Sequence, residues 1–138
     1  MRTKITSAFT LAATLMATTA NADRIRLNEL SSKQIANLQY MQDRFGPGHF
    51  LVDVAFCESS LEHTNSDGTV KLGIVDPRDT GLMQINKGYH LSDAQRMGHD
   101  LNQRSENVNY AEHLYNTQGE QPWSASDECL SDLVLPVL

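Results

Sequence analysis

Two cysteines restrict the fold of this chain more than any other feature. Cys57 and Cys129 are its only cysteines, so a single internal disulfide is the one pairing available. In an oxidising compartment that bridge would close a loop of roughly 70 residues and stabilise the fold by about 4–5 kcal/mol on the loop-entropy model, less any strain. Two reduced, buried cysteines are the alternative. The choice depends on whether the chain is exported.

The N-terminus predicts export. A basic start with Arg2 and Lys4 precedes an apolar, uncharged run and an Ala-Asn-Ala cleavage pattern that ends at Ala22. The apolar run is shorter than the roughly 20 residues that a membrane span needs, which disfavours a transmembrane anchor. We therefore expect residues 1–22 to be a cleaved signal peptide. Residues 23–138 would then fold as one disulfide-bonded domain, periplasmic or secreted, with no stable membrane anchor.

Charge and composition exclude several classes of protein. The net charge is −6, and removal of residues 1–22 takes two of the 11 basic residues and none of the 17 acidic ones, which leaves −8. No Lys/Arg cluster stands out, and this argues against a nucleic-acid binder, which needs a basic face. A hydrophobic content of 40% excludes a wholly disordered chain.

The spacing of apolar residues predicts a mostly helical domain. Helices are expected over residues 30–45, 49 to about 60, 92–97 and 105–118. Between the second and third helix, the pair Asp67-Gly68 suits a type I′ hairpin, with strands drawn from the apolar residues around it. The tail after Cys129 is expected to pack on the core or to fray. The predicted class is therefore α+β: mostly helix with a small β-hairpin.

Glu58 is a candidate general acid. On the expected second helix it shares a face with Leu51, Val54 and Ala55, close to the helix C-terminus. Burial and the negative end of the helix dipole both disfavour the charged carboxylate and raise its pKa. Such a group can keep its proton near neutral pH and donate it in catalysis. An ordinary carboxylate at the rim of the helix, held by a cap or an ion pair, is the alternative.

A second motif lies at residues 79–86, Asp-Thr-Gly-Leu-Met-Gln-Ile-Asn. Gly81 permits a close approach of the backbone or an unusual dihedral angle. Gln84 and Asn86 alternate with apolar residues, as on a strand with one wet face. Two amides on that face suit the hydroxyl and N-acetyl groups of a sugar, although a polar strand face is usually just solvated.

Together these motifs resemble those of a known family. Residues 57–60 (Cys-Glu-Ser-Ser), the motif at 79–86, and Asn107 with the pairs Tyr110-Ala111 and Leu114-Tyr115 resemble the lysozyme-like bacterial lytic transglycosylases. The similarity is greatest to the small secreted type associated with secretion systems and phages. It covers roughly residues 50–129. The Glu-Ser pair and the Asp-x-Gly-x-x-Gln-Ile-Asn pattern are also similar to c-type lysozymes.

The resemblance implies a lysozyme-like fold and cleavage of the β-1,4 bond between N-acetylmuramic acid and N-acetylglucosamine in peptidoglycan. It implies that Glu58 is the catalytic acid. In c-type lysozymes an aspartate at the place of Asp79 is the second carboxylate. Many bacterial transglycosylases have a small residue there, whereas the secretion-associated type often has an aspartate. The implied substrate-binding residues are Ser59, Gln84, Asn86, Tyr110 and Tyr115.

Two reactions follow from the same first proton transfer. A hydrolase would use Asp79 to hold or attack the cationic centre, and water would complete the reaction. A transglycosylase needs no second carboxylate, because Glu58 can take the proton from the C6 hydroxyl of the sugar and leave a 1,6-anhydro end. We favour the transglycosylase because Leu82-Met83 is the bacterial form of the motif. The alternatives are a lysozyme-type hydrolase and a non-catalytic lysozyme-like binding protein.

No metal or other cofactor is expected. The five histidines show no zinc-type spacing, and the acidic loops lack the EF-hand pattern. The expected partner is the glycan strand of peptidoglycan. An acidic enzyme is repelled by an acidic cell wall, and a secretion apparatus or phage machinery that recruits it would overcome this. Trp123 is expected to line the cleft or to belong to the core.

Overall fold

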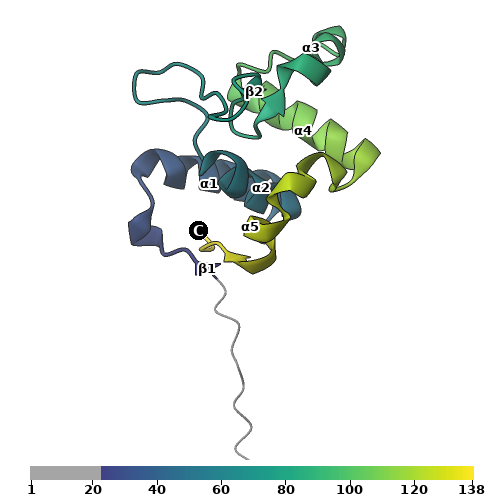
Figure 1. Ribbon diagram of the computed structural model, residues 1–138. Coiled ribbons are helices and arrows are strands. Elements are labelled where there is room, and N and C mark those ends of the chain that lie inside the picture. Colours follow the sequence, from purple (N-terminus) through teal and green to yellow (C-terminus); the bar gives the residue numbers. More distant parts are fainter. Residues whose placement is uncertain (1–22) are drawn as a thin grey trace, which may run out of the picture.

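The computed structural model describes residues 23–138, and the predicted signal peptide lies outside the described residues. The domain is mostly helical with a small two-stranded antiparallel sheet, which agrees with the predicted α+β class (Figure 1). The α-helices are α1 Ser32–Phe45, α2 Phe50–Ser59, α3 Lys87–Arg96, α4 Arg104–Gln118 and α5 Asp127–Asp132. The shorter elements are 3-10 helices η1 Leu27–Glu29 and η2 Gln121–Ser126, and strands β1 Asp23–Arg24, β2 Asp79–Thr80, β3 Ile85–Asn86 and β4 Leu133–Val134.

The first two helices begin where the sequence predicts them, within two residues. The Ser31 hydroxyl accepts a hydrogen bond from the backbone N–H of Gln34, whose side chain accepts one from the N–H of Ser31 in return. This capping box satisfies two N–H groups that the helix leaves free. Gly46 ends α1, and the His49 side chain caps α2.

Helix α2 is the centre of the core. Figure 1 shows it next to α1, with β2, α3 and α4 above and α5 below. Leu51, Val52, Val54 and Ala55 are completely buried on α2. Helix α2 thus lies between β2, α3 and α4 on one side and α5 on the other. Its last turn carries Glu58.

The small sheet lies elsewhere than predicted. The turn at Asp67-Gly68 forms, and Asp67 accepts a hydrogen bond from the N–H of Thr69. An isolated antiparallel bridge joins Thr64 to Val70 across this turn, another joins Leu72 to Thr80, and Ile74 and Val75 are 99% exposed. A second turn, closed by the bond from Asp79 N–H to the Asp76 carbonyl, leaves too few residues for longer strands. The antiparallel pair forms instead between β2 and β3.

Helix α3 is longer than the predicted 92–97. It begins at Lys87 because the Asn86 side chain caps it, accepting a hydrogen bond from the N–H of Gly88. Helix α4 agrees with the prediction to within one residue. The early start of α3 brings Tyr89 and His90 close to the motif at 79–86.

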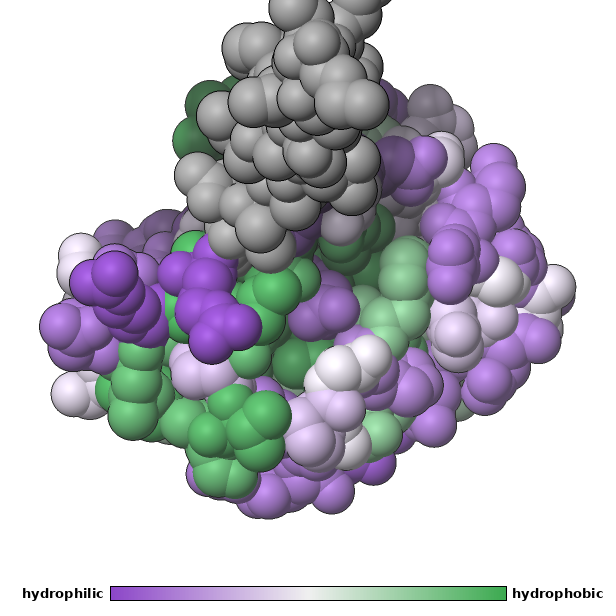
Figure 2. Space-filling model, turned by 90° about the horizontal axis from the view of Figure 1, so that it is seen from below, coloured by the Kyte–Doolittle hydropathy of each residue, from purple (hydrophilic) through white to green (hydrophobic). Residues whose placement is uncertain are grey.

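The C-terminal tail packs along the domain. Strand β4 pairs in parallel with β1, and the Gln42 side chain donates to the Pro136 carbonyl and accepts from the N–H of Leu138. Leu135 packs against the core, whereas Val137 is 72% exposed. Figure 2 shows hydrophobic residues gathered on the face seen from below. Among the described residues, no helix has both the length and the apolar character of a membrane span.

Cys57 and Cys129 form a disulfide, as predicted. Their Cα atoms are 5.9 Å apart, within the usual range for such a bond. The bridge connects α2 to α5 and so joins the middle of the chain to its C-terminal part.

Candidate active site

The two sequence motifs meet at one groove. Its volume is about 440 Å³, and its walls come from the end of α2, from the β2–β3 region, and from α3, α4 and η2. The polar side chains in its walls that matter for chemistry are Glu58, Asp79, Gln84, Asn86, Tyr89 and His90. The groove therefore combines two carboxyl groups with amides and aromatic rings.

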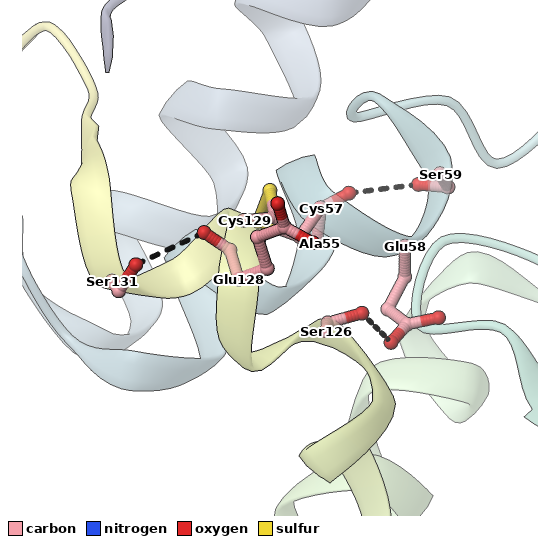
Figure 3. Close-up of a disulfide and its surroundings, with 8 residues drawn as sticks. All are labelled: Ala55, Cys57, Glu58, Ser59, Ser126, Glu128, Cys129 and Ser131. Carbon is pink, nitrogen blue, oxygen red and sulfur yellow. Dashed lines mark hydrogen bonds between the residues drawn. A yellow bond between two sulfur atoms is a disulfide. The ribbon is translucent and has the colours of Figure 1, made fainter. Parts of the chain in front are cut away.

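Glu58 is the first of the two carboxyl groups that line the groove. It lies in the last turn of α2 and is half-buried. Burial raises the pKa of its carboxyl group, and the negative charge of Asp79 acts in the same direction. The Ser126 hydroxyl donates a hydrogen bond of 2.7 Å to Oε1 and opposes that rise in pKa, because it favours the charged form (Figure 3). The pKa of Glu58 is therefore shifted upward, in the direction that the sequence predicts.

Asn107 holds the motif at 79–86 in shape. Its side chain is completely buried on α4. The Oδ1 atom accepts from the N–H of Met83 at 2.9 Å, and Nδ2 donates to the carbonyls of Thr80 at 2.9 Å and Leu101 at 3.0 Å. One amide thus satisfies backbone groups that would otherwise be buried without partners.

His63 supports the same loop from the other side. Its Nδ1 accepts from the N–H of Leu82 at 3.0 Å, and its Nε2 donates to the Asn102 carbonyl at 2.8 Å. The bond from Leu82 requires Nδ1 to be without a proton, and burial lowers the pKa of His63, which favours that neutral ring. Gly81 lies between the supports with φ of +74°, where a Cβ would lie 2.7 Å from a His63 ring carbon and 2.8 Å from Asn107 Nδ2. Glycine is therefore required there by both conformation and space.

Gln84 lines the groove, but not from a strand. Its φ of +47° is left-handed, and its amide Nε2 donates to the Gly81 carbonyl at 2.8 Å. The strand begins only at the next residue, Ile85. The predicted alternation along an extended strand is therefore wrong for this part of the motif, because the hydrogen bonds to Asn107 and His63 curl the loop.

Asn86 orients Asp79. Its Nδ2 donates to Asp79 Oδ1 at 2.7 Å and to Asp76 Oδ2 at 3.0 Å, while its Oδ1 caps α3. Both ends of the amide are therefore bonded within the protein. Asn86 thus fixes the direction of the second carboxyl group of the groove, and its predicted contact with substrate stays a prediction.

Three other predicted residues lie outside the groove lining. Ser59 is buried, and its hydroxyl bonds to backbone groups at the end of α2. Tyr110 is buried, and its hydroxyl hydrogen-bonds with Nδ1 of His90, which does line the groove. Tyr115 stacks on Phe50 with ring centroids 5.5 Å apart. These residues support the walls, and direct contact of any of them with substrate stays a prediction.

Several residues of the site were not predicted. Tyr89 and His90 line the groove from the first turn of α3, and recognition of Asn86 as a helix cap would have placed them there. Ser126 has no local signature, because it reaches Glu58 from 68 positions away. Trp123, by contrast, was expected to line the cleft or to belong to the core; it lines the groove and is only 3% exposed.

The described residues contain no group of three or more His, Cys, Asp or Glu side chains that could hold a metal ion. No family model, curated protein or solved structure matches the chain. Inference about function therefore depends on the groove and on the motifs that line it.

Proposed function

We propose that this protein cleaves the β-1,4 glycosidic bond between N-acetylmuramic acid and N-acetylglucosamine in peptidoglycan, with Glu58 as the general acid. The observation that carries the proposal is a half-buried carboxyl group with a raised pKa on the wall of a groove of about 440 Å³. The resemblance of both motifs to those of the lytic transglycosylases supports it, as does the meeting of these motifs at that groove. A lysozyme-like fold is part of the same proposal.

The first step follows from the state of Glu58. Because its pKa is raised, the carboxyl group keeps a proton at a pH where an exposed glutamate has lost it. Glu58 gives this proton to the glycosidic oxygen as the bond breaks. The amide of Gln84 and the exposed ring of Tyr89 provide polar and stacking contacts for the sugars on either side.

We propose that the reaction ends as a transglycosylation. Ionised Glu58 then takes the proton from the C6 hydroxyl of the muramic acid residue, whose oxygen attacks C1 and closes a 1,6-anhydro ring. The second candidate is hydrolysis, and one observation favours it: Asp79 lines the same groove and is oriented by a hydrogen bond from Asn86. In that case Asp79 stabilises or attacks the cationic sugar, and water is consumed.

The place of action is also a proposal. A cleaved signal peptide would deliver residues 23–138 to the periplasm or the medium. The mature chain is acidic, so an acidic cell wall repels it. We therefore propose that a secretion apparatus or phage machinery, and not electrostatic attraction to peptidoglycan, brings the protein to the cell wall.

The experiment is release of soluble muropeptides from purified peptidoglycan by the protein comprising residues 23–138. Glu58→Gln is the matched inactive variant, because the amide keeps the shape and cannot donate the same proton. Release by the original protein and none by the variant supports the proposal. Binding to peptidoglycan without release would instead identify a non-catalytic binding protein.

A further inference from the structure

Ser126 contacts the candidate acid from a distant part of the chain. It is the last residue of η2, directly before α5, and its hydroxyl donates to Glu58 Oε1 at 2.7 Å. Figure 3 shows this bond on one side of the carboxyl group, with the second oxygen pointing away from Ser126. The contact thus distinguishes the two oxygens of Glu58.

We propose that Ser126 is a positioning residue for the catalytic acid and that the disulfide keeps it in place. Ser126 holds Oε1, so the other oxygen is the one that exchanges a proton with the substrate. This inference rests on the proposed function of Glu58.

The disulfide lies next to both ends of this hydrogen bond. Glu58 directly follows Cys57 in α2, and Ser126 precedes Cys129 by three residues, about one helical turn. The two cysteine Cα atoms are 5.9 Å apart. The buried Trp123 holds η2 on the N-terminal side of Ser126. On the C-terminal side, α5 has only six residues, none of them fully buried, and Leu130 packs partly against the core. The covalent bridge adds a constraint on that second side.

The bond acts differently on the two protonation states of Glu58. A hydroxyl that donates to a carboxylate favours the ionised form and lowers the pKa of the acid. The other titratable side chains of the groove are Asp79 in β2 and Tyr89 and His90 in α3, while α4 and η2 contribute none to its lining. Asp79 and burial both raise the pKa of Glu58, so the Ser126 hydroxyl opposes them. The Ser126 hydroxyl therefore helps Glu58 to release its proton in the first step and to stay ionised until the second step.

The experiment compares an isosteric pair. Ser126→Thr keeps the hydroxyl and Ser126→Val removes it. Ser131→Ala is the control, because the hydroxyl of that exposed serine of α5 donates to the Glu128 carbonyl, away from Glu58 (Figure 3). The ¹³C resonance of the Glu58 carboxyl carbon is titrated in each protein, which requires no substrate. We expect the midpoint to move to higher pH in Ser126→Val and to stay near the original value in Ser126→Thr and Ser131→Ala.

Activity gives a second measurement. In Ser126→Val we expect kcat/KM for muropeptide release to fall about tenfold, the equivalent of one modest hydrogen bond in the transition state. The alkaline limb of the pH profile should move to higher pH, since Glu58 keeps its proton longer. Loss of packing alone would lower activity without moving that limb.

The outcomes separate the two proposals. Equal Glu58 midpoints in Ser126→Thr and Ser126→Val would overturn the role of Ser126, whatever the activity. An original protein that releases no muropeptides would refute the proposed function while the titration still reports on the hydrogen bond. If Ser126→Val does not fold, the smaller Ser126→Ala replaces it, and unfolding of both would assign Ser126 a structural role and overturn the inference.

Discussion

At the scale of single residues, the burial that makes Glu58 useful also costs stability. A carboxyl group whose pKa is raised in the folded state binds a proton more tightly there than in the unfolded chain. The free energy of unfolding therefore falls as the pH rises from the unfolded pKa through the folded one, and it stays reduced above that. The ionised form of Glu58 is therefore the one that the folded protein disfavours.

Glu58→Gln tests both the contribution of this carboxyl group to activity and its cost in stability. We expect activity to fall by about 10²–10⁴-fold, the usual contribution of a general acid. We expect the free energy of unfolding in urea at pH 7 to stay equal or rise, because a neutral amide replaces a partly buried carboxyl group whose ionised form is disfavoured there. A Glu58→Gln protein that folds normally and keeps its activity would show that another group is the acid.

The burial of Glu58 could be predicted because the apolar residues that share its helix face are three to seven positions away. Ser126 could not be predicted in the same way. Its bond to Glu58 depends on how η2 and α5 fold back on α2, and nothing local in the sequence encodes that approach.

At the scale of elements, the loop between β2 and β3 depends on two buried side chains. Asn107 and His63 bind its backbone, and a Cβ added at Gly81 would collide with both side chains. The loop in turn presents Gln84 to the groove. Its shape is therefore set by α4 and by the segment after α2 rather than by strand pairing.

Gly81→Ala is expected to destabilise the protein by about 1–3 kcal/mol through strain and to reduce activity by displacing the loop. Gly68→Ala is the matched control, since Gly68 also has a positive φ but its added Cβ would meet nothing within 4 Å. Urea denaturation measures both. If the two variants lose equal stability, the contacts with His63 and Asn107 do not constrain the loop.

The sequence predicted the helices better than the sheet. Apolar spacing and caps define α1, α2 and α4 locally. Strands β2 and β3 have two residues each, and Asn107 and His63, which come from distant segments, bond to the backbone of β2 and of the loop between them. The Asp-Gly turn formed where it was expected, but a single antiparallel bridge between Thr64 and Val70 spans it instead of a longer hairpin.

At the scale of the whole molecule, the disulfide ties the candidate acid to the C-terminal helix. Unfolded, unreduced protein should show no free thiols on titration, and two free thiols would contradict the pairing. Replacement of both cysteines by alanine should lower the free energy of unfolding by up to about 4–5 kcal/mol on the loop-entropy model. It should also shift the pH profile of activity upward, as Ser126→Val does. An unchanged profile would separate the bridge from the site.

The most direct test of the central claim is mass analysis of the muropeptides released from peptidoglycan. We predict anhydro ends, lighter by one water than the products of hydrolysis, with Asp79→Asn keeping appreciable activity because no step needs a second charge. Reducing ends, together with an Asp79→Asn loss on the order of 10²–10³-fold, would contradict the transglycosylase and favour the hydrolase. Absence of any released muropeptide from the original protein would contradict glycan cleavage itself.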